Sequence, residues 1–379
     1  MPTAIVLGAG MVGSVIAADL ARDFEVTVAD DRPASLERVA RRADVLTERV
    51  DLSDPDTIKK TIAPFDIVCG ALASHLGFNA LRAVIEAGKP YADISFMPEN
   101  ALDLHDLALA NNVTAVVDCG VAPGMSNLLA ARSASQMSPC RNIEIYVGGL
   151  PKARNWPFQY KAGFAPADVI EEYTRPARLV EHGRTVIREA LSEPELVDFP
   201  GIGTLEAVNT DGLRSIADTM DAPFMKEKTL RYPGHYELMR VFRDTGLFSK
   251  DPIDVRGVKV RPLDVLSTLM FPKWTYEDAE PDLTVMRIVA DGDIDGAPTR
   301  HAWDLLDVLD PTTGFTSMSR TTAFPCAVIA RKILDGSIAQ TGVLPPEKLG
   351  HDATLVDTVL AELRERNIRY RFTQSAPPA

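Results

Sequence analysis

The sequence has few of the residues that build metal centres and disulfide frameworks. Its 379 residues include only four cysteines and six histidines. The cysteines are far apart in the chain, and no Cys-x-x-Cys pair occurs among Cys69, Cys119, Cys140 and Cys326. We therefore expect neither a structural zinc site nor a disulfide framework, and no bound metal.

The sequence also lacks long apolar runs and an excess of positive charge. No apolar run reaches the roughly 18 residues that a membrane-spanning helix needs. The start, Met1 to Leu7, has no cationic segment before its apolar stretch, which argues against a secretory signal. Acidic residues outnumber basic ones by 53 to 40, giving a net charge of −13. This charge disfavours electrostatic binding of nucleic acid or anionic lipid by the chain as a whole. We expect a soluble cytoplasmic protein without nucleic-acid or membrane partners.

What is present in the first half is an alternation of strand and helix patterns. Ala4 to Leu7 is a continuous apolar run, as expected for a parallel strand buried on both faces. Helical periodicity fills the gaps between strands, for example over Asn79–Ala87, with Gly88 as its C-terminal cap. The alternation predicts a doubly wound parallel α/β sheet, and the length suggests about two domains. The further predicted strands are Glu25–Asp30, Arg49–Leu52, Asp66–Cys69, Tyr91–Ser95 and Thr114–Asp118.

The alternation of strand and helix patterns ends after about residue 130. Longer and more polar strand patterns predict a mixed or antiparallel sheet in a second α+β domain. Two helical patterns return near the end, Ala323–Leu334 with Pro325 in its first turn, and Asp352–Arg366. The predicted strands of this part are Ile143–Val147, Ala177–Val186, Val255–Arg261 and Leu283–Asp291.

The strongest local signal is the glycine-rich segment Gly8-Ala-Gly-Met-Val-Gly13, which directly follows the first strand and opens a helix. In this context the spacing indicates a dinucleotide-binding turn. Gly8 permits the tight turn, Gly10 lets the backbone approach a pyrophosphate, and Gly13 lets helix and strand pack closely. The first helical turn, with Met11 and Val12, offers N–H donors to the phosphates.

The predicted coenzyme is NAD, with NADP as the alternative. Asp30 ends the second strand, where an acid accepts hydrogen bonds from the adenosine ribose and repels a 2′-phosphate. Arg32 leaves the choice open, because an arginine nearby can bind that phosphate. Further contacts are expected where other strands end. The candidates are Asp51 and Leu52 near the adenine, Ala71 and Leu72 near the pyrophosphate, and Pro123 near the nicotinamide.

Polar residues beside glycine or proline mark candidate substrate-binding loops in the second domain. Arg231 is suited to hold a carboxylate through two parallel hydrogen bonds, and His235 to titrate near neutral pH. The alternatives are that Arg231 is solvated or ion-paired and that His235 has only a structural role in a turn. Asp211 with the following glycine is, by itself, an ordinary turn pattern.

Several motifs together resemble the saccharopine dehydrogenase-like family, which includes saccharopine reductases, lysine 6-dehydrogenases and carboxynorspermidine synthases. The resemblance covers about residues 1–350. Besides the glycine-rich turn it rests on Tyr91-Ala-Asp-Ile-Ser95, Cys119-Gly-Val-Ala-Pro-Gly-Met-Ser-Asn127, Gly148-Gly-Leu-Pro151, Thr210-Asp-Gly-Leu-Arg214, Lys228-Thr-Leu-Arg-Tyr-Pro-Gly-His235 and Gly342-Val-Leu-Pro-Pro-Glu347.

The resemblance implies a domain organisation and an assembly. Residues 1–128 and 320–370 would form the dinucleotide-binding domain, with the late helices packed back on it. Residues 129–319 would form the substrate-binding domain, whose sheet would mediate a homodimer.

The resemblance also implies an activity on an amino-acid substrate. Two positions depart from the saccharopine-reductase pattern, Ala122 where that subgroup has an acid and Phe96 where it has a tyrosine. The segment 119–127 is more similar to lysine 6-dehydrogenase, which implies oxidative deamination of the L-lysine side-chain amine.

The chemistry of that reaction requires several roles, which we assign to five residues. Arg231 would hold the carboxylate, Asp93 or His235 would act as the general base, and Thr210 and Asp211 would hold the α-ammonium group. Two alternatives remain: a reductive condensing enzyme of the saccharopine reductase or carboxynorspermidine synthase type, and a catalytically silent NAD-binding sensor.

Overall fold

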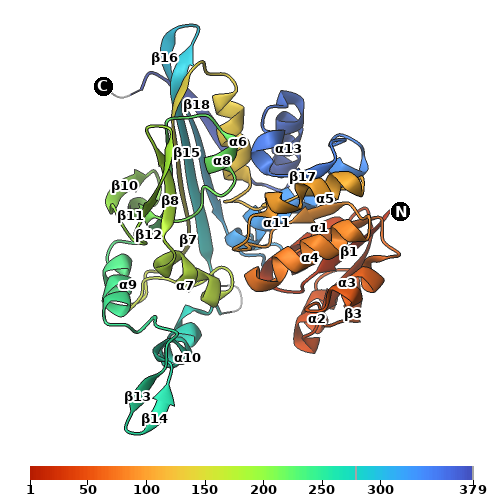
Figure 1. The fold of residues 1–379 in the computed structure, drawn as a ribbon, viewed down its shortest axis with the longest axis horizontal. Helices are drawn as coiled ribbons and strands as arrows, with labels where there is room; N and C mark the ends of the chain where they lie inside the picture. The colour runs from red at the N-terminus through yellow and green to blue at the C-terminus, as the bar shows by residue number, and fades with distance from the viewer. Residues whose placement is uncertain (278–279, 378–379) are drawn as a thin grey trace. The chain divides into compact units, whose positions relative to one another are not determined.

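A computed structural model describes residues 1–277 and 280–377, and the chain divides into two compact units (Figure 1). Unit 1 comprises Met1–Gln136 and Ser319–Arg369. Unit 2 comprises Met137–Met318 and the C-terminal residues from Tyr370 onward. Each unit has its own sheet, so each is described separately.

Unit 1 is built on a seven-stranded sheet with the order β17-β6-β5-β4-β1-β2-β3. All neighbouring strands pair in parallel, and the strand order reverses beside β1. The predicted doubly wound α/β fold is therefore confirmed. The strands are β1 (Thr3–Leu7), β2 (Glu25–Asp30), β3 (Leu46–Arg49), β4 (Ile67–Gly70), β5 (Tyr91–Asp93), β6 (Thr114–Val116) and β17 (Gly342–Leu344).

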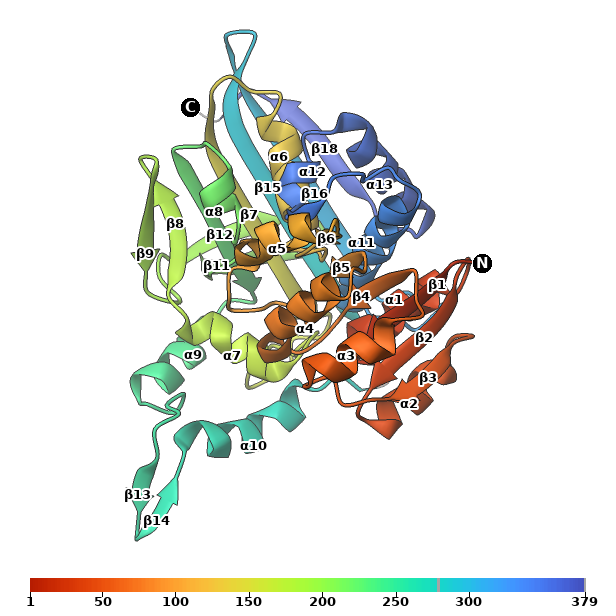
Figure 2. The same ribbon diagram turned by 45° about the vertical axis from the view of Figure 1, so that its right-hand side comes forward.

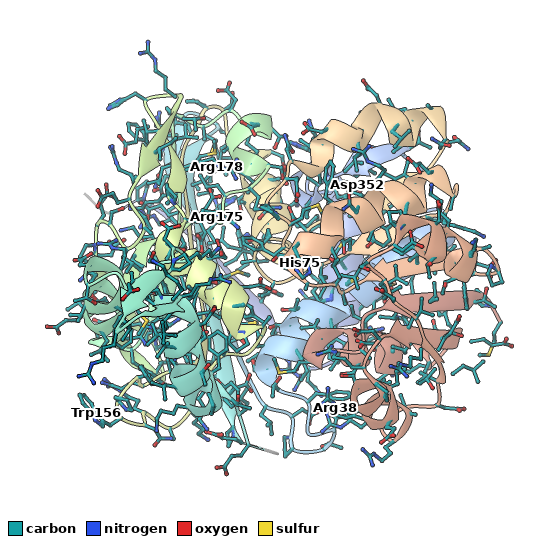
Figure 3. The ribbon with its side chains drawn as sticks, turned by 60° about the horizontal axis from the view of Figure 1, so that its bottom comes forward. Arg38, His75, Trp156, Arg175, Arg178 and Asp352 are labelled. Carbon is teal, nitrogen blue, oxygen red and sulfur yellow. The ribbon has the colours of Figure 1, made fainter. Side chains whose placement is uncertain are left out.

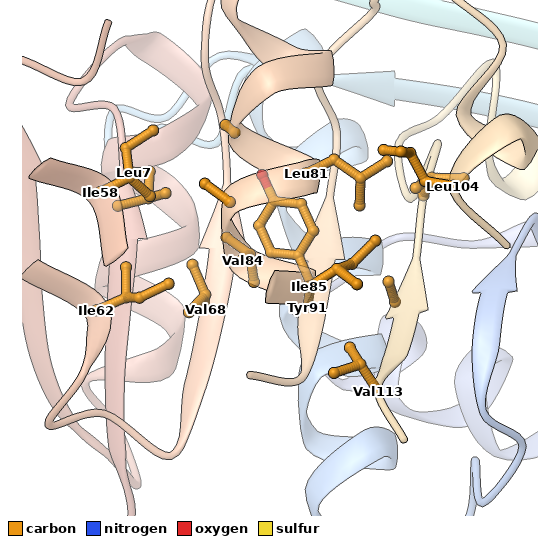
Figure 4. Close-up of a cluster of buried hydrophobic side chains, with 14 of the residues drawn as sticks. Leu7, Ile58, Ile62, Val68, Leu81, Val84, Ile85, Tyr91, Leu104 and Val113 are labelled. Carbon is orange, nitrogen blue, oxygen red and sulfur yellow. The ribbon is translucent and has the colours of Figure 1, made fainter. Parts of the chain in front are cut away.

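One face of this sheet packs on helices through a continuous apolar core (Figure 4). Leu7 and Val68 project from β1 and β4 toward Ile58 of α3 and Leu81 of α4, and all four side chains are buried. Strands buried on both faces explain the uninterrupted apolar run of β1. The connecting helices are α1 (Met11–Leu20), α2 (Pro33–Ala40), α3 (Pro55–Ile62), α4 (Ser74–Glu86) and α5 (His105–Ala110).

The C-terminal helices of unit 1 are tied to α1 by a buried carboxylate. Asp19 of α1 is 4 % exposed and, besides a 3.5 Å pair with the exposed Arg22, pairs with two arginines of the C-terminal segment. Arg331 of α11 (Ser317–Leu334) donates from Nη1 to Oδ2 at 2.7 Å, and Arg366, which follows α13 (Ala353–Glu365), donates from Nε to Oδ1 at 2.8 Å. Burial would raise the pKa of Asp19, but the two guanidinium groups outweigh it and hold the pKa below its ordinary value.

Unit 2 is built on a nine-stranded mixed sheet with the path β10-β11-β12-β7-β15-β16-β18, to which β8 and β9 are added beside β12. β12 and β7 are parallel, and the other pairs are antiparallel, so the predicted mixed sheet is confirmed. Its strands are β7 (Cys140–Pro151), β8 (Ala177–Glu181), β9 (Arg184–Arg188), β10 (Glu195–Phe199), β11 (Gly203–Asn209), β12 (Phe224–Arg231), β15 (Asp282–Ile294), β16 (Ala297–Val308) and β18 (Tyr370–Ser375).

Helices of unit 2 enclose an aromatic core. Tyr173 of α7 (Pro166–Thr174), Tyr236 of α9 (His235–Asp244) and Trp274 of α10 (Pro262–Trp274) are fully buried. A small hairpin extends from the start of α10 away from the sheet of unit 2 (Figures 1 and 2). Within 1–277 and 280–377, no helix has the length and apolarity to cross a membrane.

Several predicted elements differ from the observed ones. The strand predicted at Arg49–Leu52 lies three residues earlier, as β3. The segments Ala177–Val186 and Val255–Arg261 are hairpins rather than single strands, β8–β9 and β13 (Ile253–Val255) with β14 (Val258–Val260). Each turns through two residues with positive φ, for example His182 at 52° and Gly183 at 72°. The alternating apolar pattern spans both strands of such a hairpin, so periodicity alone does not reveal the turn.

Two predicted helix starts are also wrong. The helix predicted from Asn79 begins at Ser74. The helix predicted from Ala323 begins at Ser317, which places Pro325 inside α11 rather than in its first turn. The cause is a long-range cap, because the Asp282 carboxylate accepts hydrogen bonds from the backbone N–H groups of Ser317 and Met318 at 2.7 and 3.0 Å.

Candidate functional site

The glycine-rich turn has the shape that the pyrophosphate of a dinucleotide requires. Gly8 has a φ of +107°, and a Cβ there would lie 2.4 Å from the Ala71 carbonyl oxygen. A Cβ on Gly13 would lie 2.0 Å from the Gly8 carbonyl oxygen, whereas one on Gly10 would meet nothing within 4 Å. No side chain caps the first turn of α1, where Met11 and Val12 lie, and that turn holds no acidic residue. The turn therefore combines open space beside Gly10 with uncapped N–H donors.

Asp30 lies at the end of β2, directly beside this turn. Its carboxylate accepts a hydrogen bond from the backbone N–H of Ala9 at 2.7 Å and from the Arg32 guanidinium at 3.1 and 3.2 Å. Burial would raise the pKa of Asp30, but the hydrogen bonds from Arg32 and Ala9 keep it below its ordinary value. Asp30 is thus ionised at neutral pH and fixes the position of the glycine-rich turn.

The other predicted coenzyme contacts lie in three loops that follow strands of the sheet. Ala71 and Leu72 follow β4 and adjoin the glycine-rich turn, since the Ala71 N–H donates to the Leu7 carbonyl at 2.9 Å. Asp51 is solvent-exposed behind β3, and Leu52 is buried in the apolar core, so a contact with adenine would fall to Asp51. Pro123 lies in the loop between β6 and α6 (Met125–Ala134), which closes through a bridge between Gly120 and Gly124.

Asp93, at the end of β5, is a carboxyl group with a strongly raised pKa. It is fully buried; its Oδ1 accepts hydrogen bonds from the N–H and hydroxyl of Ser95 at 3.0 and 2.7 Å. Its Oδ2 has no hydrogen-bond partner among the described residues. Burial raises the pKa of Asp93 to about 7, with the negative charge of Asp118 adding to the shift and the Ser95 hydrogen bonds opposing it.

Asp93 is also connected to the loop after β4, where Ala71 and Leu72 are predicted to contact the coenzyme. The Ser95 hydroxyl donates to Asp93 and accepts a hydrogen bond from the Leu72 N–H at 3.2 Å. A Cβ on Gly70 would lie 2.2 Å from Asp93 Oδ1, so glycine is required there. The carboxyl ends of β1, β4 and β5 therefore bring Gly8, Leu72 and Asp93 to one edge of the sheet.

In unit 2, Arg231 and His235 belong to one buried network. Arg231 is 2 % exposed; its Nη2 donates to the Glu172 carboxylate at 2.8 Å, and its guanidinium lies 4.5 Å from the centre of the Tyr160 ring. Its Nε donates to the Tyr173 hydroxyl at 3.3 Å. That hydroxyl lies 2.9 Å from His235 Nε2. Arg231 is therefore ion-paired inside unit 2 rather than solvated.

The hydrogen bonds of His235 define its protonation. Nδ1 lies 2.8 Å from the Phe158 carbonyl, which can only accept, so Nδ1 carries the proton and Nε2 accepts from Tyr173. Burial and the nearby charge of Arg231 lower the pKa of His235 to about 3. His235 is a neutral side chain with both nitrogens engaged at physiological pH.

Thr210 and Asp211 are adjacent in the chain, but their side chains join different partners. The Thr210 hydroxyl donates to Glu227 at 2.5 Å, whereas Asp211 pairs with Arg178 of β8 at 2.8 Å. Burial raises the pKa of Glu227 to about 8. Figure 3 labels Arg178 together with Arg175, the residue that follows α7.

Three residues that contact the predicted site residues of unit 2 were not predicted from the sequence: Glu227, Glu172 and Tyr173. Glu227 lies at an alternate position from Arg231 on β12, so strand periodicity could have placed it on the same face. Glu172 and Tyr173 are on α7, and nothing in the sequence relates that helix to β12. Within 1–277 and 280–377, no group of three or more His, Cys, Asp or Glu side chains could hold a metal.

Two family models together match most of the chain. The model described as saccharopine dehydrogenase NADP binding domain matches residues 4–116, and the model described as saccharopine dehydrogenase C-terminal domain matches residues 120–368. The first match and the geometry of the glycine-rich turn agree that the coenzyme is a nicotinamide dinucleotide, NAD or NADP.

The similar proteins align with nearly the whole chain. A saccharopine dehydrogenase [NADP(+), L-glutamate-forming] from Schizosaccharomyces pombe is 22% identical, with 96% of this chain and 97% of that protein aligned. The mitochondrial alpha-aminoadipic semialdehyde synthase of Bos taurus is also 22% identical, but the chain spans only 47% of its length. The fold matches that of apo saccharopine dehydrogenase (L-Glu forming) from Saccharomyces cerevisiae with a TM-score of 0.81, at 19% identity over 99% of this chain and 100% of that chain.

Proposed function

Because this chain belongs to the saccharopine dehydrogenase family, we propose that it is an NAD(P)-dependent oxidoreductase that oxidises the carbon–nitrogen bond of an amino acid. The observation that carries the proposal is Asp93, a buried carboxyl group with a pKa of about 7 that is linked through Ser95 to the predicted coenzyme loop. A general base is most effective when its pKa lies near the working pH.

Asp93 would move two protons in this reaction. The bound coenzyme supplies the hydride acceptor. Asp93 first takes the proton of the substrate ammonium group, so that the carbon–hydrogen bond can break with its electron pair and a C=N bond can form. After releasing that proton to solvent, it takes a proton from the water that adds to this carbon and passes it to the nitrogen. The carbon–nitrogen bond then breaks, the amine leaves, and the hydroxyl proton is lost as the carbonyl forms. His235, with both ring nitrogens engaged, is the weaker candidate for this role.

We favour the side-chain amine of L-lysine as the substrate, because of the segment Cys119–Asn127. Saccharopine is the second candidate, because relatives that align over nearly the whole chain carry that name. Purified protein incubated with NAD or NADP and either compound should reduce the coenzyme, measured at 340 nm. Release of ammonia would support lysine, and release of glutamate would support saccharopine. Coenzyme binding without reduction by any amine would instead favour a silent sensor.

We propose that Arg231 holds the substrate carboxylate and that Thr210 and Asp211 hold the α-ammonium group. Glu227 and Arg231 project from the same face of β12, and Thr210 hydrogen-bonds to Glu227. These polar side chains therefore belong to one face of the strand, which supports the assignment. Arg231 is already paired with Glu172, so a substrate carboxylate would have to share or displace that partner.

Replacing Arg231 by Met should raise KM at least about tenfold, because charge-assisted hydrogen bonds contribute about 1.5–3 kcal/mol. The single variant also leaves the mostly buried Glu172 without its partner. The double variant Arg231→Met/Glu172→Gln should therefore recover thermal stability while KM stays high. Recovery of KM in the double variant would show that Arg231 has only a structural role.

We also propose that the chain forms a homodimer through the sheet of unit 2. Leu306 and Val308 occupy alternate positions of β16 and are each about half exposed, and Leu196 of β10 is 68% exposed. Large exposed apolar patches mark protein–protein contacts, and we assign these side chains to such a patch. Light scattering should give about twice the chain mass of 41.3 kDa, and Leu306→Glu should reduce it. A wild-type mass of one chain would refute the dimer.

A further inference from the structure

Tyr91, the first residue of β5, places a hydroxyl group inside the apolar core of unit 1. Its side chain is 0% exposed and belongs to the same cluster as Leu81, Val84 and Ile85 of α4 (Figure 4). The hydroxyl has no hydrogen-bond partner among the described residues. A buried hydroxyl without a partner is unfavourable, and a phenylalanine would fill nearly the same volume without that cost. Packing alone therefore does not explain a tyrosine at this position.

The Tyr91 hydroxyl faces the carboxyl group of Asp93. The two residues are at alternate positions of β5, so they project from the same face of the strand. A Cβ on Gly70 of the neighbouring strand β4 would lie 2.0 Å from the Tyr91 hydroxyl oxygen and 2.2 Å from Asp93 Oδ1. Both oxygens thus border the same space, which is open because residue 70 is a glycine. Asp93 Oδ2, like the hydroxyl, has no hydrogen-bond partner in the part of the chain that the structure describes.

The hydroxyl can act as a donor to this carboxyl group throughout the neutral pH range. Burial and the negative charge of Asp93 hold the pKa of Tyr91 well above its ordinary range, so the hydroxyl keeps its proton. A hydrogen bond from a hydroxyl stabilises an ionised carboxylate more than a neutral carboxyl group. Donation by Tyr91 therefore favours the form of Asp93 that acts as a base.

The other titratable groups around Asp93 do not favour its ionisation. They are the carboxylate of Asp118 and the buried thiols of Cys69, Cys119 and Cys326. The negative charge of Asp118 opposes ionisation. Burial holds the pKa of Cys119 well above its ordinary range, and the contact with Cys69 together with burial does the same for the pKa of Cys326. The side-chain donor that already serves the Asp93 carboxylate is the Ser95 hydroxyl, at 2.7 Å.

We propose that Tyr91 is a positioning residue for Asp93: when the carboxyl group loses its proton, the tyrosine hydroxyl moves into the space beside Gly70 and donates a hydrogen bond to the carboxylate. Tyr91 thereby stabilises and orients the ionised base without contacting the substrate or the coenzyme. This inference rests on the proposed role of Asp93 as the general base.

The test is the pH profile of kcat/KM for the Tyr91→Phe variant of the full chain, with the coenzyme and amino acid that the unmodified protein turns over. Loss of one hydrogen bond to a charged group should move the inflection upward by at least about one pH unit. At pH 7 kcat/KM should then fall at least about fivefold, because a smaller fraction of Asp93 is ionised. At high pH the variant should regain the wild-type kcat/KM, since the base itself is intact. The free energy of unfolding, measured below the inflection, should be unchanged or higher, because the variant removes a buried hydroxyl without a partner.

The matched control is Tyr370→Phe. Tyr370 begins β18 in unit 2, is 7% exposed and also has a hydroxyl without a hydrogen-bond partner within residues 1–277 and 280–377. This variant loses the same kind of buried group and should keep the wild-type pH profile. Ser95→Ala should move the inflection in the same direction as Tyr91→Phe, because it removes the other side-chain donor to Asp93.

Two results would overturn the inference while leaving the proposed function intact. One is an unshifted inflection in Tyr91→Phe when Asp93→Asn has lost it, and the other is a kcat/KM that Tyr91→Phe lowers by the same factor at every pH. If Asp93→Asn itself kept the inflection, the proposed role of Asp93 would fall together with this inference.

Discussion

Asp93→Asn should reduce kcat by about 10²–10⁴-fold, the range for loss of a general base. The asparagine is nearly isosteric and can still accept the Ser95 hydrogen bonds, but it cannot take a proton. Coenzyme binding, measured by calorimetry, should be unchanged, which separates a chemical defect from a folding defect. Asp44→Asn, an exposed carboxylate of the same unit, should retain full activity.

The pH dependence follows from the raised pKa of Asp93. The group acts as a base only when ionised, so kcat/KM should rise with pH and level off above about 7. Asp93→Asn should abolish this inflection. An inflection near 7 that persists in Asp93→Asn, or a variant with near wild-type kcat, would assign the base to another group.

Asp19→Ala should destabilise the protein by about 3 kcal/mol, because it removes the buried carboxylate that two mostly buried guanidinium groups share. Arg366 would keep only its 3.6 Å contact with Glu362, and Arg331 only its ion pair with Asp23, although both side chains are mostly buried. Chemical denaturation followed by circular dichroism would measure the change. The control is Asp23→Ala, which removes the half-exposed partner of Arg331 and should cost only about 1 kcal/mol or less.

The same carboxylate makes stability depend on pH. The pKa of Asp19 is lower in the folded state than in the unfolded chain, where it is about 4. Its contribution is therefore complete above the unfolded value and is lost as the pH falls through the folded value. The difference in unfolding free energy between wild type and Asp19→Ala should shrink in that acidic range. A difference independent of pH would mean that packing, rather than the ion pair, accounts for it.

Local sequence patterns were sufficient for the fold class and for the glycine-rich turn. The apolar run Ala4–Leu7, followed by Gly8, Gly10 and Gly13, depends mainly on contacts between near neighbours in the chain. The strand and the turn can therefore be predicted without the rest of the sequence. The hairpin at His182 and Gly183 and the start of α11 could not be found in this way. The first requires two positive φ angles, and the second requires a carboxylate 35 residues earlier.

The chain's sequence by itself determined that a doubly wound sheet presents a dinucleotide-binding turn, because residue spacing along one strand and one helix encodes it. Only the tertiary structure decided the state of the functional groups. Asp93 has a pKa near 7 because the fold buries it beside Asp118, and Arg231 is ion-paired because α7 brings Glu172 to β12. Burial and charge pairing depend on neighbours distant in sequence, and such neighbours exist only after the chain has folded.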